Sequence, residues 1–404
     1  MKQFDSIICI AQTAWKGNFQ KAAVQLMTEL SARHRVLYVD YPYTLKDLAQ
    51  GLTGRPDMPI QEMVRLRNPL VRETPKQPEG ELYVWTPPVI LPINWLSDGL
   101  HDQLLGWNTS RLIHSLRNVM RQLNMQRPLI INTYNPVLGV PLLGKLNECA
   151  TIYYCFDEIT TAGDWMSRHG KRYEDIFLQR VDAVVTTSET LRQDKSALQP
   201  ETYCVKNGAN FELFNQARQL AQEQPPTNPI VGYLGSADNR INIDLMEYCA
   251  RTMPDVTFQF IGEVHEPELT KRLADFPNVT FVPPRQPADL PPLLARLRVG
   301  IIPFVCNRHT YTIYPLKINE YLAAGLPVVS TPFSILDDFA GIIELADTPE
   351  NFAQALRRAL ADTDSKRIQQ RVDMAQRNSW EHRAREFEEV IQRIPKAWRQ
   401  EQPA

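Results

Sequence analysis

A lysine and a glutamate three residues apart, Lys317 and Glu320, are the pair in this sequence with the clearest chemical potential. They lie between Pro315 and Gly325. Proline favours the first turn of a helix and glycine the position just after its last turn, and most of the intervening residues are good helix formers. Because residues three apart share one helix face, the two side chains are expected to point in the same direction.

This predicted helix could hold a nucleotide. A helix N-terminus offers unpaired N–H groups and a partial positive charge, which suit a diphosphate. Lys317 would add a full charge near that end, and Glu320, one turn further, could accept hydrogen bonds from two neighbouring ribose hydroxyls. An exposed ion pair within the helix has the same spacing, and spacing alone favours that interpretation.

Short apolar runs, each followed by a helical segment, repeat around this stretch and predict parallel sheets built from βαβ units. The expected strands of a first series are 6–11, 36–40, 129–133, 151–156, 183–187 and 203–206. Those of a second series are 230–234, 256–261, 279–282, 299–304, 327–330 and 342–345. Ligands of such sheets bind at the carboxyl ends of the strands.

A length of 404 residues is long for one domain and points to two. We predict a first Rossmann-like lobe over 1–214, a polar linker over 215–229, a second lobe over 230–378, and a closing helix and tail over 379–404. Residues 50–127, rich in Pro, Trp and Arg, are interpreted as an irregular insertion in the first lobe. It could shape an acceptor pocket, touch a membrane surface, or simply pack a lobe edge.

Composition excludes several classes of function. A net charge of −2 argues against nucleic-acid binding. The six cysteines include no Cys-x-x-Cys pair, so they are expected to be buried thiols in a reducing compartment. No apolar stretch approaches the ~18 residues of a membrane span, and no motif calls for a metal or another cofactor.

The string 315–331, PLKINEYLAAGLPVVST, resembles the donor-site helix of retaining GT-B glycosyltransferases, and most specifically the family-4 (group 1) enzymes of bacterial polysaccharide synthesis, including the teichuronic-acid-like branch. Weaker resemblances follow in order at 13–18, 153–158, 183–191, 205–214, 230–236 and 379–381. The resemblance implies an α/β fold of two doubly wound Rossmann-like lobes facing across a cleft, with a C-terminal helix crossing back to the first lobe.

The implied reaction is transfer of a sugar, with retention, from a nucleoside-diphosphate sugar to a saccharide or lipid-linked saccharide. The setting would be cytoplasmic, with peripheral contact at the inner membrane face as an option. Arg240 and Lys317 would stabilise the departing diphosphate by charge, without metal or other cofactor. The remaining expected donor-site residues are Gly17, His309, Tyr311, Thr312, Leu316 and Glu320, and the acceptor-side candidates are Asp157, Trp165 and His169, the last within an exposed basic run.

Two departures from the family pattern keep other functions open. Thr312 stands where many members carry the first of two glutamates eight positions apart, and no lysine lies close to Arg240. Sugar contacts at Thr312 are therefore in question. A non-catalytic GT-B scaffold in polysaccharide assembly and a sugar-nucleotide epimerase are the alternatives.

Overall fold

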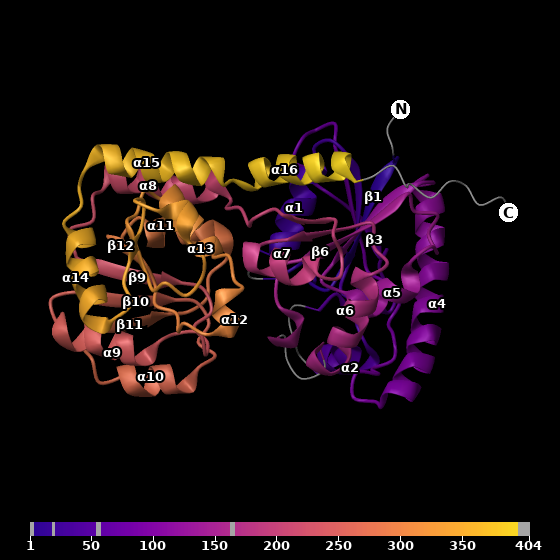
Figure 1. Ribbon diagram of the computed structural model, residues 1–404, viewed down its shortest axis with the longest axis horizontal. Helices are drawn as coiled ribbons and strands as arrows, with labels where there is room; N and C mark the ends of the chain where they lie inside the picture. The colour runs from indigo at the N-terminus through magenta and orange to yellow at the C-terminus, as the bar shows by residue number, and fades with distance from the viewer. Residues whose placement is uncertain (1–3, 18–20, 54–57, 162–165, 395–404) are drawn as a thin grey trace. The chain divides into compact units, whose positions relative to one another are not determined.

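The computed structural model describes residues 4–17, 21–53, 58–161 and 166–394 (Figure 1). The chain forms two compact units. The first comprises residues up to 17, 21–205 and the chain from 384 onward, and the second comprises chiefly 206–383. Helix α16 (Trp380–Arg393) therefore begins in the second unit and continues in the first.

The first unit is built on a sheet of eight strands within the described residues, in the order β3-β4-β2-β1-β5-β6-β7-β8. All neighbouring pairs are parallel except β3 with β4. Strand β1 is buried along its whole length, as expected for a central strand covered on both faces. The strands are β1 (Ser6–Ala11), β2 (Arg35–Val39), β3 (Leu70–Glu73), β4 (Glu81–Trp85), β5 (Pro128–Thr133), β6 (Ala150–Cys155), β7 (Ala183–Thr186) and β8 (Thr202–Cys204).

The helices of this unit include one unusually long member, α4, of 25 residues. They are α1 (Ala22–Leu30), α2 (Leu45–Leu52), α3 (Ile60–Met63), α4 (Asp98–Gln122), α5 (Pro136–Leu142), α6 (Lys171–Leu178) and α7 (Glu189–Ser196), with a 3₁₀ turn η1 (Ile159–Thr161) and a π turn η2 (Met166–Gly170).

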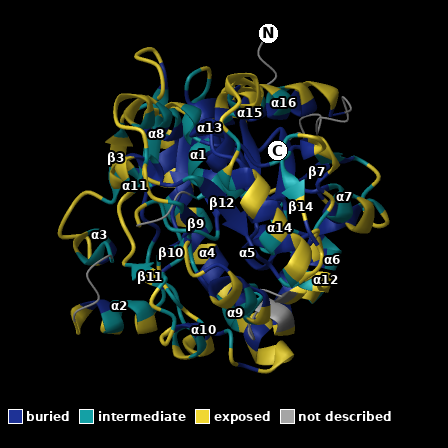
Figure 2. Ribbon diagram, turned by 90° about the vertical axis from the view of Figure 1, so that its left-hand side faces the viewer, coloured by how far each residue is buried: buried dark blue, intermediate teal, exposed yellow. Residues whose placement is uncertain are grey.

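The second unit carries a fully parallel sheet of six strands within its described residues, in the order β11-β10-β9-β12-β13-β14. Its strands are β9 (Ile230–Leu234), β10 (Thr257–Ile261), β11 (Val279–Val282), β12 (Val299–Ile302), β13 (Val328–Ser330) and β14 (Glu344–Leu345). In Figure 2 the inner strands β9 and β12 are buried, whereas β11 and β14 at the edges of the sheet are only partly covered. The helices are α8 (Phe211–Glu223), α9 (Ile243–Thr252), α10 (Pro267–Leu273), α11 (Leu290–Leu294), α12 (Arg308–Tyr311), α13 (Leu316–Ala323), α14 (Pro349–Leu360) and α15 (Ser365–Arg377), with 3₁₀ turns η3 (Pro287–Asp289) and η4 (Asp337–Phe339).

The predicted strands are all present, with ends that shift by at most two residues. The segment 50–127 is not irregular, because it adds β3 and β4 to the sheet and contains α4. Strand β4 pairs with β2 from Arg35–Glu81 to Val39–Trp85, a long-range pairing that the local pattern does not reveal. The prolines in and around this segment obscured its strand and helix patterns in the sequence.

The expected linker 215–229 is also different in the structure. Helix α8 occupies most of it, and Phe214 and Ala217 are buried in the core of the second unit. The change between units therefore falls at residues 205–206. A polar, Gln-rich sequence is compatible with a helix that buries a narrow apolar stripe.

Candidate functional site

Helix α13 is shorter than expected and covers Leu316–Ala323, with Pro315 at its N-cap. Gly325 ends it in a left-handed conformation, φ +76°, and the next amide, of Leu326, donates to the carbonyl of Tyr321 at 3.0 Å. This glycine-based turn satisfies carbonyls that the helix end would leave open.

One face of α13 is anchored in the core. Ile318, Tyr321 and Leu322 are fully buried. The Tyr321 hydroxyl accepts a hydrogen bond from the Leu234 amide at the end of β9, at 2.7 Å. A Cβ on Gly300 of β12 would lie 2.5 Å from the Tyr321 ring, so this close approach requires glycine. These contacts fix the helix against the carboxyl end of the sheet.

The opposite face presents Lys317 and Glu320 to a cavity. The Lys317 ammonium lies 5.4 Å from the ring centroid of Tyr233 and 5.9 Å from that of Phe304, within the range of cation–π attraction. Gly235, at φ +118°, makes room for it, since a Cβ there would lie 2.6 Å from Lys317 Cε. The lysine is thus held at the carboxyl end of β9.

Arg240 joins Lys317 at this cavity. Its Nε and Nη2 donate to the two carboxylate oxygens of Asp238 at 2.7 and 2.6 Å. Its guanidinium lies 5.2 Å from the centroid of Phe304, so the two cations share one aromatic ring. The ion pair orients Arg240 by a bidentate geometry that also matches phosphate.

Burial shifts the pKa of both charged residues of α13. It lowers the pKa of Lys317 to about 8, and the nearby Arg240 adds to the effect. It raises the pKa of Glu320 to about 7, against the opposing influence of Lys317. Both groups therefore change protonation close to neutral pH, as is common at functional sites.

The cavity has a volume of about 250 Å³ and lies entirely within the second unit. Gly235 and Gly262 follow the carboxyl ends of β9 and β10, where open α/β sheets bind ligands. The lining residues are Phe214, Leu234, Gly235, Ser236, Arg240, Ile261, Gly262, Pro284, Arg285, Pro287, Leu290, Leu316, Lys317 and Glu320.

Four of the expected donor-site residues line this cavity together, namely Arg240, Leu316, Lys317 and Glu320. Gly235, Gly262 and Arg285 also line it but were not singled out from the sequence. Each glycine directly follows an expected strand. A glycine immediately after a predicted parallel strand could therefore have indicated both positions. Arg285 lies in a loop after β11, where no local pattern indicates its direction.

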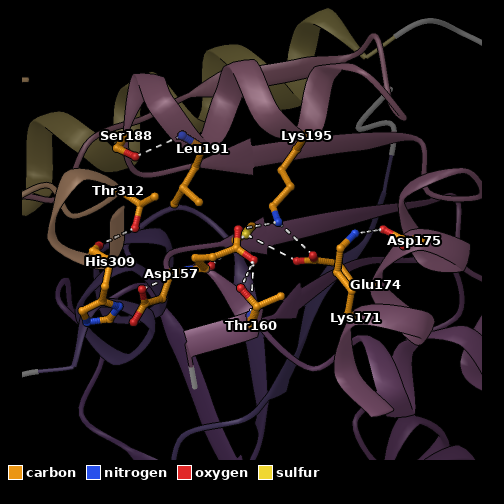
Figure 3. Close-up of polar contacts among 12 residues, drawn as sticks. Asp157, Thr160, Lys171, Glu174, Asp175, Ser188, Leu191, Lys195, His309 and Thr312 are labelled. Atoms are coloured by element: carbon orange, nitrogen blue, oxygen red, sulfur yellow. Dashed lines mark hydrogen bonds and ion pairs between the residues drawn. The ribbon is translucent and has the colours of Figure 1, made fainter. Parts of the chain in front are cut away.

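The residues expected just upstream lie on or beside α12, outside the set that lines the cavity. The Thr312 hydroxyl donates to the carbonyl of His309 at 2.8 Å (Figure 3), and the side chain of Tyr311 is exposed. The Thr312 side chain thus takes part in a local contact at the end of α12.

In the first unit, Gly17 belongs to the loop that joins β1 to α1, with φ +144°. The Lys21 ammonium donates to the carbonyls of Ala14 and Lys16 in this loop. Buried Asp40, at the end of β2, accepts from the Trp15 amide at 2.7 Å. Burial raises the pKa of Asp40 to about 6. These contacts tie residues 14–16 of the loop to Lys21 and to the end of β2.

Asp157 follows β6 and lies beside a buried ionic network (Figure 3). The Lys195 ammonium donates to Glu174 at 2.8 Å and to Glu158 at 3.1 Å, and the Tyr153 hydroxyl donates to Glu174 at 2.9 Å. Glu174 is fully buried. This network ties α6 and α7 to the turn that carries Asp157. Trp165 lies outside the described residues.

The expectation that His169 is exposed is wrong. His169 is fully buried, and its ring stacks on His101 with centroids 4.0 Å apart. One ring nitrogen lies 3.2 Å from the carbonyl of Leu96. Burial, and then the neighbouring His101, lowers its pKa. The basic run around His169 suggested an exposed side chain, but the π turn η2 directs His169 inward, whereas Arg168 remains exposed.

Solved structures with the same fold cover nearly the whole chain. Sucrose-phosphate synthase from Thermosynechococcus elongatus matches with a TM-score of 0.67 and 16% identity, over 96% of this chain and 99% of that one. HepE of Anabaena, in complex with UDP and glucose, matches with a TM-score of 0.62 and 15% identity, over 97% of this chain and 100% of that one. The fold is therefore that of GT-B proteins.

Sequence comparison adds a family match within the second unit and one curated relative. Residues 228–362 match the family model described as glycosyl transferases group 1. TuaH of Bacillus subtilis strain 168, provisionally described as a glycosyltransferase of teichuronic acid biosynthesis, is 26% identical over 215 residues, which are 48% of this chain and 53% of that protein. The match thus spans about half the length of this curated relative. The second unit carries a group 1 glycosyltransferase domain.

Among the helices of the described residues, none combines the length and apolar character needed to cross a membrane.

Proposed function

We propose that this protein is a glycosyltransferase that transfers a sugar from a nucleoside diphosphate to a saccharide or lipid-linked saccharide, in bacterial cell-surface polysaccharide synthesis. The observation that carries the proposal is the cavity at α13, where Lys317, Glu320 and Arg240 converge at the carboxyl end of a parallel sheet. The family of the second unit and the description of TuaH support the same reaction class and setting.

The residues of the cavity divide into two roles. Lys317, Arg240 and the first amides of α13 would bind the diphosphate and stabilise the negative charge that grows on it as the sugar departs. Glu320, one turn into the helix, would accept hydrogen bonds from the ribose hydroxyls. Since these cations can supply the stabilisation, we propose that transfer needs no metal ion. Retention at the anomeric carbon rests on the family resemblance.

Nucleotide binding tests the proposal first. Isothermal titration with UDP, GDP and dTDP should identify one nucleotide that binds the chain, and UDP is the first choice because the HepE structure contains it. Glu320→Ala should weaken that binding, whereas Glu268→Ala, an exposed position on α10, should leave it unchanged. If none of the three nucleotides bound, the donor site would be refuted.

Turnover separates the remaining alternatives. A glycosyltransferase should release nucleoside diphosphate from the donor only when an acceptor is present. A sugar-nucleotide epimerase would change the sugar of the donor without any acceptor, and a scaffold would bind nucleotide without either reaction. NMR of the donor sugar during incubation distinguishes all three outcomes and also reports the anomeric configuration of the product.

A further inference from the structure

An apolar surface of the first unit remains uncovered. Trp95, in the loop before α4, is 73% exposed, and Leu100 and Trp107 on α4 are 47% and 46% exposed. Leu45 and Leu52, seven residues apart on α2, are 49% and 70% exposed. The five residues belong to α2, to α4 and to the loop that precedes α4, and exposed apolar surface of this kind marks interaction sites. We call these five residues the apolar face.

Hydrogen bonds join the elements that carry the apolar face. The Leu45 amide donates to the carbonyl of Ile90 at 3.0 Å, which fixes α2 to the loop before α4. The buried side chain of Asn108 then holds this loop to α4, accepting from the Leu91 amide at 2.9 Å and donating to its carbonyl at 3.1 Å. The apolar face therefore belongs to one connected platform, with α4 along the edge of the first unit in Figure 1.

Cations continue the exposed side of α4. Leu100, Trp107, His114 and Arg121 recur at seven-residue intervals and so lie on one side of the helix, and all four are exposed. Arg111, one turn after Trp107, places its guanidinium 4.7 Å from the Trp107 ring centroid. This arrangement combines an aromatic ring with a long cationic side chain, as in residues at a membrane interface.

Basic residues outnumber acidic ones along α4 and the segment that follows it. Residues 103–147 include Arg111, Arg117, Arg121, Arg127 and Lys145 but no Asp or Glu. Two acidic residues, Asp98 and Asp102, lie in the first turns of α4. The carboxylate of Asp102 is paired with Arg172 at 2.6 Å, whereas the side chain of Asp98 is 65% exposed and lies 3.4 Å from the buried ring of His169. Basic charge beside exposed tryptophans is complementary to anionic lipid headgroups.

We infer that the apolar face and the arginines of α4 form a docking surface for an anionic lipid membrane. The tryptophans and leucines would enter the headgroup region, and Arg111 and Arg121 would contact lipid phosphates. The inference extends the proposed function, because it would bring the enzyme to a lipid-linked acceptor. Membrane binding is nevertheless measured without any sugar transfer, so the two proposals can fail separately.

Flotation with phosphatidylcholine vesicles, with and without phosphatidylglycerol, tests the docking surface. The full chain should bind only vesicles that contain the anionic lipid, and about 0.5 M salt should release it. Trp95→Ser/Trp107→Ser should abolish binding. Arg111→Gln/Arg121→Gln should weaken it roughly 30-fold, because each cation near an anionic surface contributes about 1 kcal/mol.

Two controls make the result specific. Leu220→Ser and Lys271→Gln remove an exposed apolar residue and an exposed cation from the second unit and should leave flotation unchanged. Nucleotide binding by the tryptophan and the arginine double variants should equal that of the unchanged protein, which verifies folding. Equal flotation of these variants and the unchanged protein, or no flotation at all, would overturn the inference. A dimer in light scattering that the tryptophan variant loses would instead assign the surface to a second copy.

Discussion

Replacing Lys317 by methionine removes the charge at the donor cavity and keeps an unbranched apolar side chain. The aliphatic part of the lysine side chain packs closely against Gly235, and its ammonium lies near Tyr233 and Phe304. Methionine can keep most of this packing. The substitution therefore isolates the contribution of the ammonium to nucleotide binding.

The expected loss follows from the kind of interaction. A hydrogen bond to a charged group contributes about 1.5–3 kcal/mol, so Lys317→Met should weaken nucleoside-diphosphate binding roughly 10- to 150-fold. Arg240 and the α13 amides remain and should retain weak binding. The folded stability should not fall, because burial already disfavours the charged form of Lys317.

The pH dependence of binding should change in a characteristic way. In the unchanged protein, Glu320 gains a proton below about pH 7 and Lys317 loses one above about pH 8. Affinity should therefore be highest between these values and fall on both sides. In Lys317→Met the alkaline decline should disappear. The acidic decline should move to higher pH, because Lys317 lowers the pKa of Glu320.

Isothermal titration with the nucleotide that binds, at pH values from about 6 to about 9, measures both effects. Lys271→Met, which removes an exposed lysine on α10, serves as the matched control and should behave like the unchanged protein. An unchanged Kd in Lys317→Met at neutral pH would refute the role of the ammonium. Persistence of the alkaline decline in that variant would show that another group titrates.

Three further predictions follow from the same structure. Gly235→Ala should weaken nucleotide binding, since its Cβ would displace Lys317, and should cost about 1–2 kcal/mol of stability at φ +118°; calorimetry and denaturant unfolding measure the two effects. Lys195→Met should lower the free energy of unfolding by about 3–5 kcal/mol, because it removes the cation that pairs with the buried carboxyl group of Glu174. Urea unfolding should show partial recovery in Lys195→Met/Glu174→Gln. Sugar transfer should survive prolonged treatment with EDTA, and loss of activity that Mg²⁺ restores would contradict a metal-free reaction.

Much of the fold follows from local pattern. Apolar runs with turn residues at their ends located the strands of the two sheets, except β3 and β4. The regular structure of the segment 50–127 was not predicted, because β4 is stabilised by its pairing with β2. Helix α4 is likewise stabilised by contacts of Asn108 and by a narrow buried stripe. Neither kind of contact is visible in a local window. The prediction of a linker over 215–229 was wrong for the same reason, since Phe214 and Ala217 become buried only in the assembled core.

The order of residues was sufficient to place Lys317 and Glu320 on one face of a helix, because helical periodicity is a local property. It did not determine which elements meet that face. The packing of α13 on β9 and β12 brings Lys317 to Gly235 and Arg240, and this packing removes water and moves both pKa values toward neutrality. The burial of His169 against His101 depends likewise on contacts between distant segments. Local sequence thus determined the charged pair of the site, whereas long-range packing determined its neighbours, its burial and its protonation.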